Sequence, residues 1–457
     1  MELFGTAGIR GSAEERVTPE LALAVGRAVG ADTVGNASEA DASPVVIARD
    51  GRTTGPALAA AVEAGVESAG ADVQRAGMLP TPALAYASRG GRGVMLTASH
   101  NPPTDNGIKV FVDGEEYDRE LERGIESRVA GEQTPAAWDV WGRSEDVDVL
   151  AAYRDAVVAY AQGHGARADG LDVAVDCGNG MGALGTPPVL RDLGARVVTL
   201  NGQVDGYFPG RESKPTPESL SDLRAFVADG AFDLGIGHDG DADRIVILDG
   251  DGDVVHEDTV VAILAEHFTR VAATDDPVVV TTPNASGRID ERVRAAGGRV
   301  ERVRLGALHE GIAAARAAGG DVVFAAEPWK HIHPSHGGWI DGVASAAVLT
   351  RLVASDGLDG LRGPVTERPY RKVSVECADD RKREAMARLE TTLPESFPDA
   401  DVDTEYGVRL EFPDASWTLV RPSGTEPYVR VYAEADDVDA LVDEVTGVVE
   451  RAVADGD

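Results

Sequence analysis

The sequence predicts a soluble protein of four domains, three of them α/β and the last a smaller α+β domain. The chain has 457 residues, and at roughly 100 to 200 residues per domain this length suggests about three or four domains. Three successive segments alternate short apolar strands with helical patterns, which favours sheets covered by helices. After Pro369 polar and apolar residues alternate, as they do in half-exposed antiparallel strands.

The first segment contains an unusual strand end. PVVIARD, from Pro44, predicts a buried strand, residues 55–71 predict a helix, and residues 72–84 predict a strand that leads to a turn. Residues 94–96 predict another strand, which enters TASHNPPTDNGIK. Two prolines and Asp105-Asn106-Gly107 predict a turn there. A hydroxyl and an imidazole are therefore expected at the end of a buried strand.

The later segments repeat this order. The second begins near Leu171 with a strand, a glycine-rich turn, a helix that ends at Gly194 and another strand. Residues 233–255 then predict a strand, an acidic loop and a hairpin, and residues 277–306 again predict strand, helix and strand. In the last segment we expect strands within 370–378, 406–424 and 428–435, and helices at 379–393 and 437–453. The predicted domains are 1–148, 149–253, 254–366 and 367–457.

The chain is strongly acidic, with 78 Asp and Glu against 43 Lys and Arg and a formal net charge of −35. A field of this sign repels nucleic acid and anionic membranes, so we expect neither as a partner. Acidic excess with few lysines resembles proteins that work in molar salt. The alternative is a chain that is merely acidic, and a salt titration would separate the two. An anionic substrate needs local positive charge, which draws attention to arginines inside motifs.

No stretch of about 18 or more uncharged apolar residues occurs, and MELFGTAGIRGS lacks the regions of a signal peptide. We therefore expect a cytoplasmic protein, as a monomer or a weak homo-oligomer. Cys177 and Cys377 lie far apart in sequence without a Cys/His spacing near either. They predict two reduced thiols rather than a disulfide or a zinc site.

An acidic loop, GHDGDADR, predicts a metal site. Asp239, Asp241 and Asp243 alternate after an apolar strand, so one loop can direct three hard carboxylate oxygens at one divalent cation. An EF-hand is excluded, because its sixth and twelfth positions would be Arg244 and Gly250 instead of Gly and Glu. A solvated acidic loop is the alternative. Three close carboxylates repel one another unless a positive charge lies between them, which favours a metal.

Two further loops join glycine to arginine. RPSGTEP, 421–427, offers the guanidinium of Arg421, two hydroxyls and a glycine, which suit a phosphate dianion. A plain turn is the alternative, but Arg430 nearby in so acidic a chain favours phosphate. FGTAGIRG, 4–11, is weak evidence alone. The motif GMGALG, 180–185, fits a dinucleotide fingerprint, but the next strand ends in Asn201 instead of an acidic residue, so we interpret it as a structural turn.

Four of these motifs together resemble those of the α-D-phosphohexomutases. FGTAGIRG, TASHNPP followed by NGIK, GHDGDADR, and RPSGTEP followed by VRVYAEA occur in that family's order and approximate spacing, over essentially the whole chain. The resemblance implies a heart-shaped enzyme of four domains, the first three with mixed sheets of one topology, and an active site in a central cleft. The implied reaction interconverts sugar 1-phosphate and sugar 6-phosphate through a phosphoserine and a sugar 1,6-bisphosphate, which also serves as activator.

The resemblance also implies roles for individual residues. Ser99 is the implied phosphoserine, and Asp239, Asp241 and Asp243 hold Mg²⁺ together with a phosphoserine oxygen. Arg10 and Lys109 resemble the groups beside the transferring phosphoryl, with His100 as a supporting contact. Lys109 could exchange the sugar hydroxyl proton if neighbouring arginines lower its pKa. The implied substrate-binding residues are Arg244, Glu327, His331, Arg421, Ser423, Gly424 and Thr425.

One motif departs from the family. AAEPWKHIHPSHGG keeps Glu327 and His331 but has Trp329 and Lys330 where family members commonly have Ser-Gly. The preference among glucose, mannose, glucosamine and pentose phosphates therefore stays open. Two other classes are possible: a sugar bisphosphate synthase or phosphatase that uses the same phosphoserine, and a non-catalytic phosphosugar-binding protein. Intact Ser99, Lys109 and the aspartates argue against the last.

Overall fold

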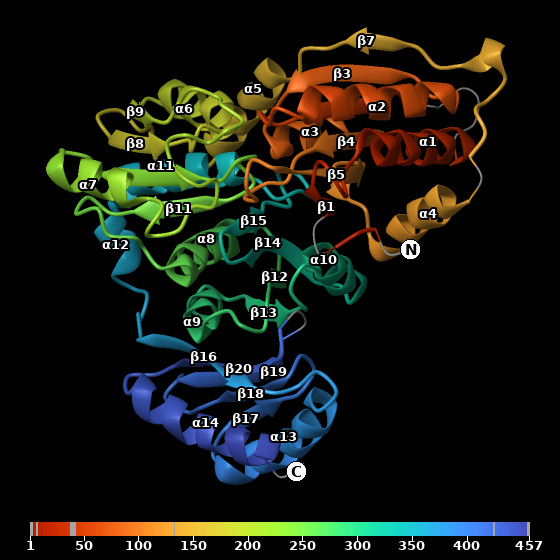
Figure 1. Cartoon of the computed structure of the whole chain (residues 1–457). Helices are drawn as coiled ribbons and strands as arrows, with labels where there is room; N and C mark the ends of the chain where they lie inside the picture. The colour runs from red at the N-terminus through yellow and green to blue at the C-terminus, as the bar shows by residue number, and fades with distance from the viewer. Residues whose placement is uncertain (1–2, 6–7, 37–42, 132, 424–425, 455–457) are drawn as a thin grey trace. The chain divides into compact units, whose positions relative to one another are not determined.

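The computed structural model describes residues 3–5, 8–36, 43–131, 133–423 and 426–454 (Figure 1). The chain forms two compact units. The first unit contains Met1–Glu257 and Trp329–Leu361, and the second contains Asp258–Pro328 and Arg362–Asp457. None of the helices in the described ranges combines the length and apolarity needed to cross a bilayer.

The first sheet of the first unit is mixed. Its strands lie in the order β1-β5-β4-β2-β3-β7, with β6 beside β5. Strands β2, β3 and β4 are parallel, whereas β5 runs antiparallel to β1 and β4. The strands are β1 (Ile9–Ser12), β2 (Val45–Arg49), β3 (Val73–Met78), β4 (Arg92–Leu96), β5 (Asp105–Val112), β6 (Glu115–Glu116) and β7 (Ser144–Asp146). The helices are α1 (Pro19–Asn36), α2 (Gly55–Ser68), α3 (Thr81–Ala87), α4 (Arg119–Ala130) and the short η1 (Trp138–Val140).

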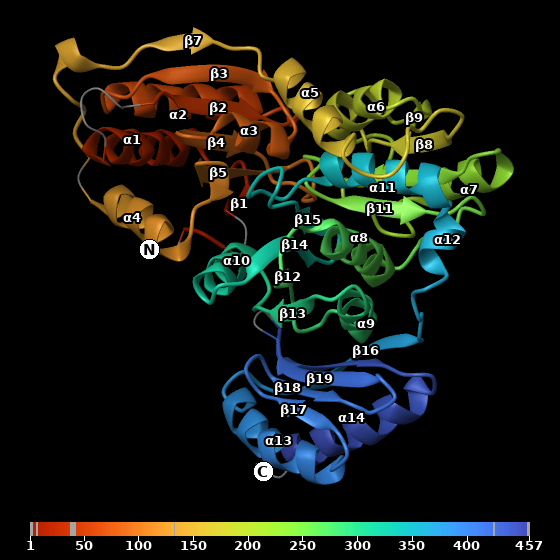
Figure 2. The same cartoon turned by 180° about the vertical axis from the view of Figure 1, so that it is seen from behind.

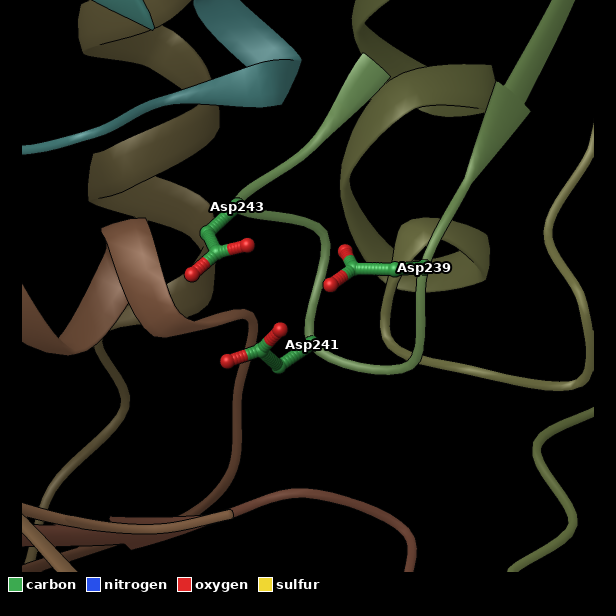
Figure 3. A group of neighbouring side chains, drawn as sticks. All are labelled: Asp239, Asp241 and Asp243. Atoms are coloured by element: carbon green, nitrogen blue, oxygen red, sulfur yellow. The ribbon is translucent and has the colours of Figure 1, made fainter. Parts of the chain in front are cut away.

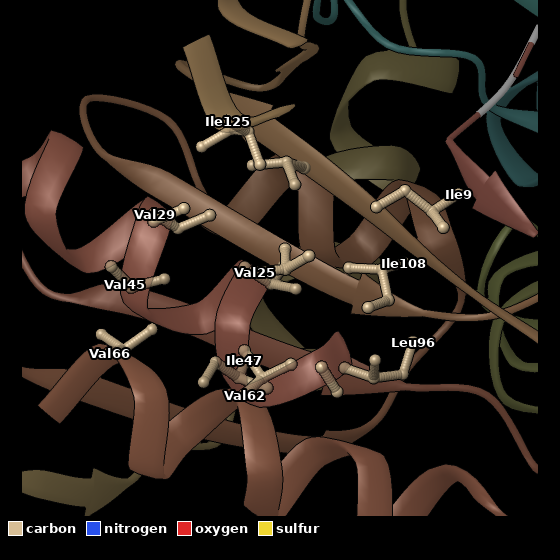
Figure 4. Packing of buried hydrophobic residues seen from close by; sticks show 14 of the residues in the cluster. Ile9, Val25, Val29, Val45, Ile47, Val62, Val66, Leu96, Ile108 and Ile125 are labelled. Carbon is tan, nitrogen blue, oxygen red and sulfur yellow. The ribbon is translucent and has the colours of Figure 1, made fainter. Parts of the chain in front are cut away.

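A core of branched aliphatic side chains joins this sheet to α1, α2 and α4 (Figure 4). Helices α1 and α2 approach closely because each carries a glycine at their contact. A Cβ on Gly26 would lie 2.2 Å from the carbonyl oxygen of Val62, and one on Gly65 would lie 2.4 Å from that of Leu23. The two helices share this core with β2 and β4, and the candidate site begins after β4.

The second sheet of the first unit has the order β11-β10-β8-β9. Strand β11 is antiparallel to β10, and the other pairs are parallel. The strands are β8 (Asp172–Asp176), β9 (Arg196–Leu200), β10 (Leu234–His238) and β11 (Ile245–Leu248), and the short β15 (Lys330–Ile332) also belongs to this unit. The helices are α5 (Leu150–Ala161), α6 (Gly182–Asp192), α7 (Ser221–Asp229) and α11 (Gly342–Asp356), and α12 (Leu358–Arg362) ends at the boundary between the units.

The second unit contains a parallel and an antiparallel sheet. In the first, β12 (Pro277–Thr281) lies between β13 (Arg299–Arg302) and β14 (Asp321–Glu327). The second has the order β16-β20-β19-β18-β17, and α13 and α14 cover one face of it (Figures 1 and 2). Its strands are β16 (Tyr370–Glu376), β17 (Asp401–Asp403), β18 (Val408–Glu411), β19 (Trp417–Pro422) and β20 (Tyr428–Glu434). The helices are α8 (Glu257–Val271), α9 (Gly287–Ala295), α10 (Leu308–Ala317), α13 (Lys382–Ser396) and α14 (Val438–Ala454).

Two local predictions were wrong. Asp105, Asn106 and Gly107 begin β5 instead of forming a turn, because Gly107 fits between two backbones: a Cβ there would lie 2.3 Å from the Thr97 oxygen. The stretch after β3 forms helix α3 instead of a turn only, because prolines favour the first turn of a helix and Pro82 occupies it. The expected mixed α/β architecture, the antiparallel sheet near the C-terminus and the two free thiols are confirmed.

Candidate active site in the first unit

The loop after β4 presents Ser99. Its backbone has φ of +51°, in the left-handed region that non-glycine residues rarely adopt. The Ser99 amide donates to Thr97 Oγ1 at 2.9 Å, and Ser99 Oγ donates to Asp239 Oδ2 at 2.6 Å. The side chain is fully buried. The loop therefore aims the hydroxyl at the acidic loop of the neighbouring sheet.

The acidic loop joins β10 to β11, and its three aspartates point toward one another (Figure 3). Asp239, Asp241 and Asp243 are buried, and one oxygen from each lies within 4.8 Å of the others. Ala242 has φ of +61°, which turns the chain between the last two aspartates. Gly240 lies against the Ser99 loop, because a Cβ on it would lie 2.5 Å from the Ser99 carbonyl oxygen.

The charges of this cluster fit a divalent cation. Oδ1 of Asp241 and Oδ1 of Asp243 are buried without a hydrogen-bond partner in the described chain. Burial raises the pKa of Asp239 well above its ordinary value, and the charges of Asp243 and Asp241 raise it further. Buried acceptors without donors are costly, and carboxylate and hydroxyl oxygens are the ligands that Mg²⁺ prefers. The donor set fits this ion.

Lys109, on β5, lies among carboxylates. Its Nζ is 3.0 Å from Asp243 Oδ2, 3.6 Å from Asp241 Oδ2 and 3.3 Å from Glu116 Oε1. Burial disfavours the ammonium, but the charges of Glu116, Asp243 and Asp241 outweigh burial and raise the pKa of Lys109 above its ordinary value. The lowered pKa that proton exchange by Lys109 would require is therefore not found, although the charge of Arg10 acts in that direction. Lys109 supplies fixed positive charge.

Other cations surround Ser99 and the aspartates. Arg244 Nε lies 3.9 Å from both Asp239 Oδ2 and Asp243 Oδ1 and has no hydrogen-bond partner in the described chain. Nε and Nη2 of Arg10 are also buried without a hydrogen-bond partner there. His100 Nδ1 is 3.3 Å from Ser99 Oγ. Burial, followed by the charges of Arg244 and Arg10, lowers the pKa of His100 to about 3. The guanidinium groups of Arg10 and Arg244 thus have N–H donors available beside the neutral imidazole of His100, an arrangement that suits the binding of an anion.

The site contains supporting residues that the sequence did not single out. Thr81, at the start of α3, donates from Oγ1 to Asp241 Oδ2 at 2.7 Å. Arg52 forms a buried ion pair with Asp50 and bonds the Ser99 loop. Lys330, noted from the sequence only as a departure from the sugar motif, pairs with Arg244 in an isolated antiparallel bridge. Burial raises the pKa of Asp243, but the charge of Lys109, followed by that of Lys330, outweighs burial and lowers it below its ordinary value. A useful indication was available: Asp50-Gly51-Arg52 follows a parallel strand next to β4, and ligands commonly bind at such strand ends.

His331, a predicted substrate residue, and Trp329, the departure from the sugar motif, both have internal partners in this unit. His331 is buried, and its Nδ1 lies 3.0 Å from Ser345 Oγ. Trp329, which has φ of +66°, packs against the apolar cluster of α7, β8 and β11, and its carbonyl accepts from the Ile245 amide at 3.1 Å. The indole thus has a packing role. The glycine-rich motif also has one, because a Cβ on Gly180 would lie 2.6 Å from the Gly240 oxygen.

The remaining predicted residues belong to the second unit. Glu327, at the end of β14, accepts a hydrogen bond from the Gly306 amide. Arg421 Nη2 donates to the Tyr432 hydroxyl at 3.0 Å, while its Nε is buried without a partner in the described chain. Lys382 Nζ donates to the Ser423 oxygen at 2.6 Å and so supports the predicted phosphate loop. Gly424 and Thr425 lie outside the described residues.

Comparisons with known proteins agree with this geometry. Family models of the phosphoglucomutase/phosphomannomutase α/β/α domain I, α/β/α domain II and C-terminal domain match residues 1–136, 151–252 and 373–450. A phosphopentomutase of Thermococcus kodakarensis is 42% identical over 95% of this chain and 94% of its own length. A probable phosphoglucosamine mutase of Methanopyrus kandleri is 41% identical over 98% of each chain.

A solved phosphoglucomutase/phosphomannomutase family protein from Burkholderia thailandensis has a TM-score of 0.85 and 26% identity, over 98% of this chain and 96% of its own. The similarity extends along almost the whole length of each of these relatives. The matches to the models of domains I and II span the residues of the Ser99 loop and of the aspartate loop. The chain therefore belongs to the phosphoglucomutase/phosphomannomutase family and is an isomerase of the phosphomutase class.

Proposed function

We propose that the protein interconverts sugar 1-phosphate and sugar 6-phosphate through phosphorylated Ser99 and a sugar 1,6-bisphosphate intermediate. The observation that carries this proposal is the 2.6 Å contact of Ser99 Oγ with Asp239, inside a buried cluster of three carboxylates. A serine in ordinary structural use does not need such surroundings. A phosphoserine does, because its negative charge requires a cation and several donors.

The chain's own residues suit phosphoryl transfer, which depends mainly on positioning and on neutralising charge. Mg²⁺, held by Asp239, Asp241 and Asp243 with a phosphoserine oxygen, would neutralise phosphoryl charge when bound. Arg10 and Arg244 would donate to the phosphoryl oxygens from nitrogens that have no partner in the described chain. Protonated Lys109 would add positive charge beside Asp243 and Asp241, and neutral His100 would keep a hydrogen bond to Ser99 Oγ.

A second phosphate is bound elsewhere in this proposal. We assign it to Arg421 and Ser423, with Gly424 and Thr425 as further predicted contacts. The free Nε of Arg421 supports the assignment, because a buried guanidinium nitrogen without an acceptor is costly. These residues, called the phosphate clamp below, must accept the phosphate at either end of the sugar, since the bisphosphate has to turn around between the two half-reactions.

We assign the substrate to one class, the phosphates of glucose, mannose or glucosamine. Glu327 would bond the sugar hydroxyls, and His331, four positions later in the sequence, is the other residue assigned to the sugar. A phosphopentomutase is the second candidate, and the 42% identity to the Thermococcus kodakarensis phosphopentomutase favours it. A panel of sugar 1-phosphates, assayed with Mg²⁺ in low and high salt, distinguishes these substrates. Free phosphate measured alongside distinguishes a mutase from a phosphatase, and accumulation of bisphosphate identifies a synthase.

The direct test concerns Ser99. Serine monoesters belong to the class with the slowest uncatalysed hydrolyses, which enzymes accelerate by up to ~10²¹-fold, so a phosphoenzyme persists during isolation. Incubation with glucose 1,6-bisphosphate should add one phosphate to the Ser99 peptide, measured by mass spectrometry. Ser99→Ala should lose this phosphate and nearly all mutase activity while it still binds sugar phosphate. Wild-type turnover by Ser99→Ala would refute the mechanism.

A further inference from the structure

Arg52 directs its whole guanidinium group at the backbone of the Ser99 loop and at one carboxylate. The side chain is fully buried, and its Nε donates to Asp50 Oδ2 at 3.0 Å. Nη2 donates to the carbonyl oxygens of Ser99 at 2.9 Å and Asn101 at 2.8 Å. Nη1 donates to those of Pro102 at 2.5 Å and Asp105 at 2.9 Å. One side chain therefore bonds three carbonyls of the Ser99 loop and the first carbonyl of β5.

This arrangement compensates a costly backbone conformation. Residues 97–104 form neither helix nor strand, so their inward carbonyls need donors from elsewhere. Ser99 also has a left-handed φ, which disfavours a residue with a Cβ. Asp50 continues the support, because Thr97 Oγ1 donates to Asp50 Oδ2 at 2.7 Å and accepts from the Ser99 amide. The bonds of Arg52 and Asp50 reach Ser99 through its carbonyl and its amide.

A loop between β9 and α7 holds Arg52 from the other side. The Arg52 guanidinium carbon lies 5.1 Å from the centre of the Phe208 ring, and Phe208 has φ of +50°. A Cβ on Gly206 would lie 2.4 Å from the Gly51 oxygen, so this loop packs tightly on the turn that carries Arg52. Ser213 Oγ donates to the Asn101 carbonyl at 3.1 Å. The guanidinium is thus enclosed between the Ser99 loop and an aromatic face.

We propose that Arg52 is a positioning residue for phosphoryl transfer: it fixes the Ser99 loop so that Ser99 Oγ stays against the aspartate cluster. Arg52 contacts no substrate in this proposal and acts through the loop carbonyls. The proposal rests on the proposed function, because it gives a reason for the exact placement of a hydroxyl that accepts phosphate. A misplacement of about 1 Å at a reacting group can cost ~100-fold in rate.

Arg52→Lys is the informative variant, because it keeps the charge but loses the planar fork. Arg351→Lys is a matched control in the same unit. Arg351 is also buried, and it donates to three loop carbonyls, those of His164 at 2.6 Å, Gln162 at 3.3 Å and Gly165 at 3.5 Å. These acceptors lie far from Ser99 in sequence and outside its loop. Both variants therefore lose a buried guanidinium group, but only Arg52→Lys loses the bonds that position Ser99.

The measurement is the single-turnover rate at which glucose 1,6-bisphosphate phosphorylates Ser99 in the full chain with excess Mg²⁺, together with the melting temperature, KM and kcat. We expect Arg52→Lys to slow phosphorylation and kcat about 100-fold at little change in KM. We expect Arg351→Lys to keep the wild-type rate at a similar loss of melting temperature. Equal rates for the two variants would overturn the proposal.

Thr97→Val decides the matter if Arg52→Lys does not fold. The change keeps the shape of the side chain and removes only the hydroxyl between Asp50 and the Ser99 amide. Phosphorylation should slow about tenfold for two lost hydrogen bonds, and an unchanged rate would overturn the proposal. If wild-type Ser99 takes no phosphate, the proposed function itself fails. If the wild type reacts and the variants match it, only the role of Arg52 fails.

Discussion

Gly240→Ala tests how closely the aspartate loop must approach Ser99. The backbone at Gly240 does not have the left-handed φ that favours glycine, so alanine is excluded by contact alone. The new Cβ would lie 2.5 Å from the Ser99 carbonyl oxygen. Ordinary contact for such atoms begins near 3.4 Å. One loop must therefore move from the other by about 0.9 Å, since backbone cannot rotate out of the way as a side chain can.

This displacement would separate the Ser99 loop from the aspartate loop, which the proposed phosphoryl transfer requires to be in contact. Moving the aspartates by about 0.9 Å from Ser99 should lower kcat ~100-fold, or about 2.7 kcal/mol in activation free energy. KM should change little, because Arg421 and Ser423 are not disturbed. Overpacking should also lower the free energy of unfolding by about 1 to 3 kcal/mol. Steady-state kinetics against sugar 1-phosphate and urea unfolding measure the two effects separately.

Gly124→Ala is the matched control. Gly124 lies within α4, and a Cβ on it would meet no atom within 4 Å. The control should keep full activity and gain stability, since alanine favours a helix by about 0.5–1 kcal/mol over glycine. If Gly240→Ala were as active as Gly124→Ala, the close approach of the two loops would have no catalytic meaning and the reasoning would be refuted.

Three further predictions concern metal binding, the phosphate clamp and the stability of the protein at low pH. Asp241→Asn should raise the Mg²⁺ concentration needed for half-maximal activity while leaving the fold intact, and wild-type turnover in excess EDTA would contradict the metal assignment. Arg421→Ala should weaken substrate binding by about 1.5 to 3 kcal/mol, seen as a higher KM; an unchanged KM would mean that the loop is only a turn. Burial lowers the pKa of His331 to about 3 and lowers that of His333 as well. Because unfolded histidines titrate near ~6.5, the unfolded chain binds more protons, so the free energy of unfolding should fall by up to about 1.4 kcal/mol per pH unit for each histidine as pH drops below about 6.5. Urea unfolding at constant salt checks this, and a flat profile between neutral pH and about pH 5.5 would contradict it.

Sequence patterns predicted the parts of the fold in which local periodicity and burial agree. The strand of PVVIARD, the helix after it and the alternating strands beyond Pro369 are confirmed. The aspartate cluster was predictable for the same reason, since its members come from a single loop and need no long-range contact to meet. The Asp105-Asn106-Gly107 segment was mispredicted because residues that favour turns were judged without the strands on either side of them.

Charge environments could not be predicted in this way. Lys109 meets Asp243 across 134 positions of sequence and Glu116 across a turn, so the sign of its pKa shift depends on packing. Trp329 was noticed as a departure from a sugar-binding motif, but its packing against α7 and β11 required the fold. Arg52 was overlooked because its partners in the loop are backbone carbonyls. Every residue has a backbone carbonyl, so the loop sequence gives no sign of these hydrogen bonds.

That last property affects how this loop can change during evolution or in the laboratory. The carbonyls of Asn101, Pro102 and Asp105 are present whatever side chains those positions carry. Substitutions in the loop can therefore alter its chemistry while its path is kept by a residue encoded some fifty positions earlier. Conversely, a Ser99 loop transplanted into a homologue would keep its conformation only if the recipient supplied an arginine at the end of the adjacent strand. Grafting experiments should move the two segments together.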